Sequence, residues 1–155
     1  MGVAIEPPPK PERPPAGGPV KAMPPLEGRY LPITDAQRKA WRAAAMKHLE
    51  ACNVPIDTPN MNTGAKPNAV GITLVVFQTP HPDQSVTVTV QAHIQQQAFL
   101  RKDSANWIMA ITMRRTAEMR VARTETDRAV EALARQLIDL VVQRYRDENS
   151  GAPNP

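Results

Sequence analysis

The sequence predicts an α+β domain built as a two-layer sandwich, in the order α-β-β-β-α, behind an extended proline-rich arm. The arm is predicted because ten of the 17 prolines fall within the first 32 residues. Proline lacks a backbone N–H and fixes φ, so such a stretch forms neither helix nor sheet. Beyond it, hydrophobic residues recur with a helical period, then a strand period, then a helical period again. We expect an arm over residues 1–33, a folded domain over 34–148 and a disordered tail over 149–155.

The first helix is expected over residues 34–52. Thr34 is a suitable N-cap and Gln37 stands at the matching position of a capping box. A stripe of apolar residues at three- and four-residue spacing, from Trp41 to Cys52, predicts the buried face. The segment 53–69 holds three prolines and is expected to be a long loop.

Three strands are expected next, over about residues 72–77, 86–95 and 107–114. The first is apolar on both faces, and the second alternates valine with polar residues. Turn residues at 80–83 and 102–105 separate the strands. Short connections between consecutive strands predict a three-stranded antiparallel meander.

The last helix is expected from about residue 126 to Tyr145, with Thr124 or Thr126 as its N-cap. Its inner face is marked by apolar residues at helical spacing, with Ile138 and Val142 widening the stripe: Val130, Leu133, Ala134, Leu137, Val141 and Tyr145. Because a sheet with one apolar face needs cover, we expect both helices on the same side of the meander.

No catalytic or cofactor motif is present. The chain lacks a P-loop, HExxH, CxxC, an EF-hand loop, GxGxxG after a strand and GxSxG. Cys52 is the single cysteine, which excludes an internal disulfide, and we interpret it as a small buried hydrophobe with no thiol-based metal site. His48 is interpreted as a residue at the border of the helix stripe. We therefore predict no enzyme activity, no cofactor and no metal.

A binding function is predicted from two stretches. The segment 70–100 carries one charged residue, Asp83, although sheet faces exposed to water usually carry charge. The predicted contact residues are Thr87, Thr89, Gln91, His93 and Gln95 on the polar strand face, and Pro8, Pro9, Pro11, Pro14 and Pro15 in the arm. We interpret the chain as a structural or accessory subunit that binds other protein subunits, including copies of itself.

Three alternatives remain open. A nucleic-acid-binding module would use an anion patch formed by Arg114, Arg115, Arg120 and Arg123. The net charge of +4 is thinly spread and aromatic residues are few, which argues against it. A small enzyme would use His93 or His81 with an acidic or metal partner. An envelope protein would use the arm as a spacer. The sequence as given has no apolar run long enough to span a membrane and no secretory leader. The cellular compartment is therefore not predicted: the protein is cytoplasmic or part of a large particle, or periplasmic if a leader was removed.

Overall fold

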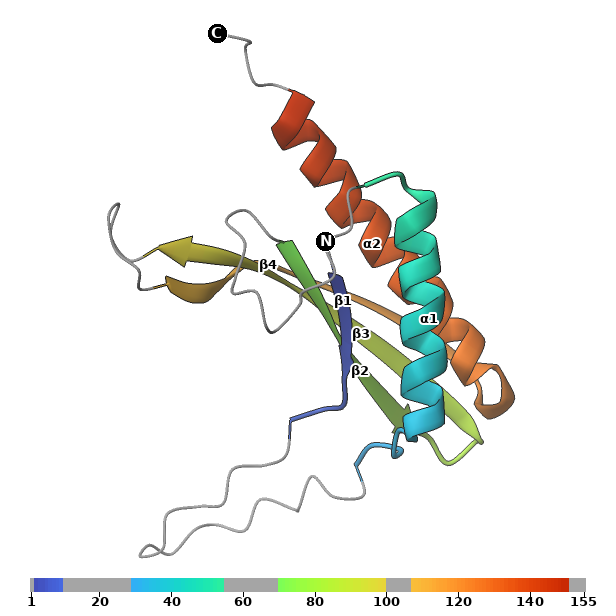
Figure 1. Cartoon of the computed structure of the whole chain (residues 1–155). Coiled ribbons are helices and arrows are strands. Elements are labelled where there is room, and N and C mark those ends of the chain that lie inside the picture. Colours follow the sequence, from blue (N-terminus) through green and yellow to red (C-terminus); the bar gives the residue numbers. More distant parts are fainter. Residues whose placement is uncertain (1, 10–28, 55–69, 100–106, 151–155) are drawn as a thin grey trace, which may run out of the picture.

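The computed structural model describes residues 2–9, 29–54, 70–99 and 107–150. A four-stranded mixed sheet forms one layer and two α-helices lie against one of its faces (Figure 1). The elements are β1 (Gly2–Glu6), α1 (Asp35–Ala51), β2 (Val70–Pro80), β3 (Ser85–Phe99), β4 (Trp107–Ala122), the 3-10 turn η1 (Arg123–Glu125) and α2 (Thr126–Ser150). The mixed α/β architecture with two helices agrees with the predicted fold class.

The prediction of a purely antiparallel sheet of three strands is wrong, because β1 adds a fourth strand parallel to β2. Val3 lies opposite Ile72 and Ile5 opposite Leu74, and both β1 side chains are buried in the core. The residues that form β1 were assigned to the arm on account of the prolines that follow them. A parallel strand pairs with a distant segment across a long crossover, so local sequence says little about it.

The other strands form the expected antiparallel meander, in the order β2, β3 and β4. β4 runs to Ala122, which is well beyond the predicted end at residue 114. Strand β2 extends past the point where its pairing with β1 ends. There the backbone N–H of Leu31 donates to the carbonyl oxygen of Gln78 at 2.8 Å. The edge of β2 is therefore bonded by β1 and by the segment that leads into α1.

Helix α1 begins and ends as its local sequence predicts. Thr34 Oγ1 accepts from the backbone N–H of Gln37 at 3.1 Å, and Gln37 Oε1 accepts from the backbone N–H of Thr34 at 3.0 Å. The helix ends at Ala51 with Cys52 as its C-cap, and the next residue, Asn53, has a φ of 54°. Asparagine tolerates this left-handed conformation, which commonly ends helices. The end of α1 holds Cys52 in a defined position beside α2.

The core lies between the helices and the sheet face that they cover. On α2 it contains every residue of the predicted stripe from Val130 to Val141, together with Ile138 and Val142. On β3 it contains five residues that alternate along the strand: Val86, Val88, Val90, Ala92 and Ile94. Both sets follow directly from the helical and strand periods in the sequence.

Polar bonds join the two helices at the start of α2. Asp127 Oδ1 accepts from Trp41 Nε1 at 3.1 Å and from Gln37 Nε2 at 3.1 Å. Trp41 is only 2% exposed, so its indole N–H has little access to water. Asp127→Ala should therefore lower the free energy of unfolding by about 1–3 kcal/mol, the cost of leaving a buried donor unpaired. Urea denaturation measures this.

Asp147→Ala is the matched control for this prediction. Asp147 lies on the same helix and accepts through Oδ1 from exposed Gln143 at 2.8 Å. Its replacement should change stability by less than about 0.5 kcal/mol, as is usual for surface substitutions. Equal effects of the two variants would contradict the structural role assigned to Asp127.

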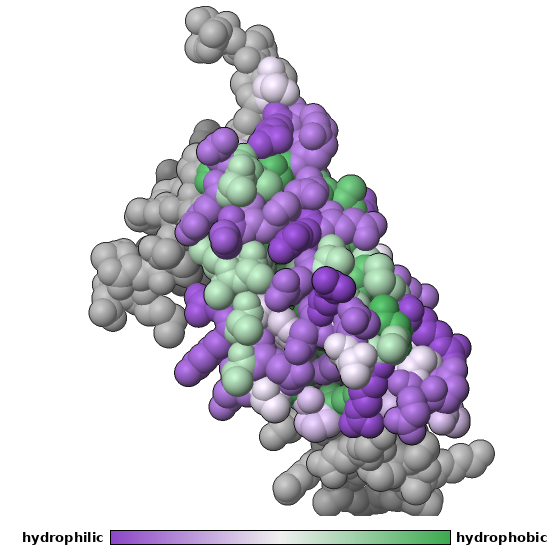
Figure 2. Space-filling model, turned by 90° about the vertical axis from the view of Figure 1, so that its right-hand side faces the viewer, coloured by the Kyte–Doolittle hydropathy of each residue, from purple (hydrophilic) through white to green (hydrophobic). Residues whose placement is uncertain are grey.

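The outer surface of the helix layer is mainly hydrophilic, with small scattered apolar areas (Figure 2). Exposed ion pairs occur along it, such as Arg144 with Glu148 at 2.6 Å. Among the described residues, no helix is both long and apolar enough to cross a membrane. The helix layer thus presents a mainly polar, water-facing surface.

Candidate functional site

The predicted polar row lies on the sheet face opposite the helices. Its five residues (Thr87, Thr89, Gln91, His93 and Gln95) are half-buried. On the neighbouring strand β2, Thr73 and Val75 point to the same side and are buried, at 7% and 6% exposed. Part of this sheet face is therefore shielded from solvent within the single chain. Of the predicted arm contacts, Pro8 and Pro9 are described, whereas Pro11, Pro14 and Pro15 lie outside the described residues.

Charged side chains flank the polar row on its other side. The register places Arg120 opposite Thr87, Glu118 opposite Thr89 and Arg114 opposite His93. Residues directly opposite across antiparallel strands share a face. The uncharged row on β3 thus borders a line on β4 that carries both basic and acidic residues, which adjacent sequence positions do not reveal.

The predicted anion patch does not form one surface. Arg114 and Arg120 lie on the open face, whereas Arg115 lies opposite Ala92 on the helix-covered face. Arg120 is already engaged, because its Nη2 donates to Asp83 Oδ2 and its Nε to Ser85 Oγ, each at 2.8 Å. Hydrogen bonds from Ser85, with a smaller contribution from Arg120, lower the pKa of Asp83 to about 2. The carboxylate is ionised at neutral pH and neutralises Arg120.

The histidines of the enzyme alternative lie apart. His81 Nε2 is 2.7 Å from Thr87 Oγ1 in the β2–β3 turn, and His93 has Thr73 and Arg114 as its cross-strand neighbours. Among the described residues, neither ring is hydrogen-bonded to a carboxylate. The described part of the chain therefore gives neither ring the acidic partner that the enzyme alternative calls for.

Strand β4 forms one edge of the sheet. Within the described residues this strand of 16 residues is bonded to β3 alone, with a register shift at Thr112. Most side chains between Thr112 and Arg120 are exposed, including Met119 at 42%. A strand edge of this length presents a row of unpaired N–H and C=O groups.

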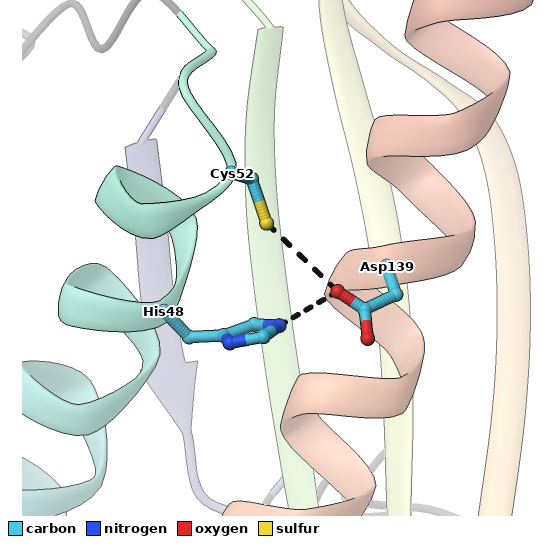
Figure 3. Close-up of side chains that lie close together, drawn as sticks. All are labelled: His48, Cys52 and Asp139. Atoms are coloured by element: carbon cyan, nitrogen blue, oxygen red, sulfur yellow. Dashed lines mark hydrogen bonds and ion pairs between the residues drawn. The ribbon is translucent and has the colours of Figure 1, made fainter.

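A second feature, which the sequence analysis missed, lies between the two helices. His48 and Cys52, one turn apart on α1, face Asp139 of α2 (Figure 3). His48 Nε2 is 2.7 Å and Cys52 Sγ 3.8 Å from Asp139 Oδ1. The three donor atoms all lie within 4.8 Å of one another. We call these three residues the interhelix cluster.

The interhelix cluster does not have the order of a nucleophilic triad. In such a triad the imidazole stands between the nucleophile and the carboxylate, whereas here the carboxylate contacts both other groups. Burial raises the pKa of the Cys52 thiol, and the Asp139 carboxylate raises it further, against a smaller opposing effect of Arg146. These effects favour the protonated thiol, and a protonated thiol is a poor nucleophile.

One signal in the sequence points to part of this cluster. His48 and Cys52 are four residues apart, which places them on one face of a helix. The third member comes from an element 87 residues further along the chain. A single cysteine excludes a site built from several thiolates, whereas a mixed set of thiolate, imidazole and carboxylate donors needs only one.

Comparison with protein-family models, curated protein sequences and solved structures gave no significant match.

Proposed function

We propose that this chain is a non-catalytic assembly subunit that pairs with a second copy of itself along the free edge of β4. The proposal is carried by one observation: a strand of 16 residues is bonded on one side only among the described residues. Strand addition at such an edge forms a continuous sheet through main-chain hydrogen bonds. Identical subunits most often pair about a two-fold axis, and two antiparallel copies of one strand satisfy that symmetry.

The charges on β4 favour one register of this pairing. When Thr116 lies opposite Thr116 of the second copy, Arg114 of each copy lies opposite Glu118 of the other. The two-fold axis therefore gives two such pairs. Both side chains point to the face away from the helices. Opposite charges directly across two strands contribute roughly 0.2–1 kcal/mol per pair, and like charges are unfavourable. Because β4 carries both positive and negative charges on this face, it is electrostatically complementary to an antiparallel copy of itself.

The same register brings apolar residues together on the other face. Met119 then lies opposite Met113 of the second copy, on the side that the helices cover. Met119 is 42% exposed in the single chain, and Met113 is 8% exposed. Pairing would remove the Met119 side chain from water, at about 25 cal/mol per Å² of apolar surface buried.

The polar row on β3 and the proline-rich arm, the contacts predicted from the sequence, are compatible with pairing along β4. The polar row on β3 lies one strand in from the interface, on the sheet face that the two copies would share. The proline-rich arm remains a predicted contact for further subunits of a larger assembly.

Charge exchange across the interface tests the proposal. Light scattering after size exclusion, over a range of concentrations, should find a dimer. Arg114→Glu, or Glu118→Arg, should weaken dimerisation about tenfold or more, because two attractive pairs become repulsive. The double variant Arg114→Glu with Glu118→Arg should restore it, because the pairs reappear with their signs exchanged.

The control is Arg128→Glu, which reverses a charge on α2 where the side chain is 85% exposed. It should leave the dimer unchanged. A protein that stays monomeric at every concentration, or a dimer that none of the β4 substitutions weakens, would contradict the proposal.

A further inference from the structure

We infer that the interhelix cluster is a zinc site in which His48, Cys52 and Asp139 supply three ligands and water supplies the fourth. This inference is independent of the pairing along β4, because it rests on different residues in a different layer of the molecule. It revises the expectation that the chain holds no metal.

The donor set suits zinc. A thiolate is a soft ligand, imidazole is borderline and a carboxylate is hard, a mixture that favours zinc over magnesium or calcium. Sites with three protein ligands and one open position are a regular form of zinc coordination. A dipositive ion bound by one thiolate, one carboxylate and a neutral imidazole is also balanced in charge.

Two of the three distances between ligand atoms need adjustments of less than about 1 Å to reach tetrahedral zinc geometry, and the third pair, His48 Nε2 and Cys52 Sγ, lies within 4.8 Å. Zinc–sulfur bonds of about 2.3 Å and zinc–nitrogen or –oxygen bonds of about 2.0–2.1 Å place tetrahedral ligand atoms roughly 3.3–3.6 Å apart. His48 Nε2 and Asp139 Oδ1 are 2.7 Å apart, and Cys52 Sγ and Asp139 Oδ1 3.8 Å apart. The cation would take the place of the proton shared by the imidazole and the carboxylate, and would displace the thiol proton to solvent.

The surroundings hold the ligands and admit a cation. His48 and Cys52 lie in the last turns of α1, and Arg146 Nη2 donates to the carbonyl oxygen of Cys52 at 2.6 Å, which ties this helix end to α2. The His48 side chain is 25% exposed and that of Asp139 60% exposed. A cation and its remaining water therefore have an open path to the cluster.

The experiment is a titration of the full-length protein with Co²⁺, followed by competition with Zn²⁺. A cysteine thiolate bound to Co²⁺ gives a sulfur-to-metal charge-transfer band in the near ultraviolet. Because Cys52 is the chain's single cysteine, this band reports one site only. We expect the band to saturate at one metal per chain, to disappear on addition of Zn²⁺ and to be absent from Cys52→Ser. Zn²⁺ should also raise the melting temperature of the wild type, because it binds the folded state.

His48→Gln and Asp139→Asn should each weaken binding by about 100-fold or more, since even outer-shell changes weaken metal sites 10–100-fold. His93→Gln, which removes a histidine remote from the cluster, should change nothing. The inference is wrong if no charge-transfer band appears, if His48→Gln and Asp139→Asn bind as the wild type does, or if the band saturates at one metal per two chains.

Discussion

Replacing Leu137 with aspartate is expected to unfold the protein. Leu137 is 1% exposed and lies at the centre of the α2 stripe that packs on the sheet. The change removes a buried leucine side chain, which alone costs about 2–5 kcal/mol, and puts an unpaired carboxylate in its place at further cost. The sum is comparable with the whole stability of a typical domain, about 5–15 kcal/mol.

Far-ultraviolet circular dichroism and urea denaturation measure this effect. Leu140→Asp is the matched control, because Leu140 lies on the same helix, carries the same side chain and is 49% exposed. We expect it to change stability by less than about 0.5 kcal/mol. A folded Leu137→Asp protein with wild-type stability would show that α2 does not pack as described.

The second large effect is expected at the start of the chain, in β1. Ile5 is 5% exposed and pairs with Leu74, and Arg42 Nε of α1 donates to the carbonyl oxygen of Val3 at 3.3 Å. Ile5→Asp should therefore detach β1 and lower the free energy of unfolding by about 3 kcal/mol or more, through lost burial and a buried charge. Urea denaturation measures the loss.

Ala4→Asp provides the control within the same strand. Ala4 is exposed, and successive strand residues point to opposite faces, so this carboxylate stays in water. We expect wild-type stability to within about 0.5 kcal/mol. If Ile5→Asp and Ala4→Asp were equally stable, β1 would not belong to the core. For the same reason, a truncation meant to remove only the arm must keep residues 2–6.

Much of the fold could be predicted because its signals are local. The capping box at Thr34 and Gln37, the apolar stripe of α2 and the alternation along β3 each depend on neighbours within a few residues. Hydrogen-bonding geometry and periodicity act over the same short range.

The candidate sites could be predicted only in part. Two ligands of the interhelix cluster share a helix turn, but Asp139 reaches them only when α1 and α2 pack side by side. The four arginines predicted to form a patch are close in sequence, yet the alternation of a strand separates Arg114 from Arg115. The possibility of ion pairs between two copies of β4 becomes evident only from the structure, in which Glu118 and Arg114 lie on the same sheet face.

By itself, the sequence determined the two helices, the three strands of the antiparallel meander and the absence of the motifs that mark common catalytic and cofactor sites. Short-range periodicity and capping chemistry are sufficient for these. The tertiary structure decided that β1 joins the sheet, that β4 is left with a free edge and that His48, Cys52 and Asp139 meet. Each of these depends on contacts between segments far apart in the chain, which form only when burial of the common core brings the segments together.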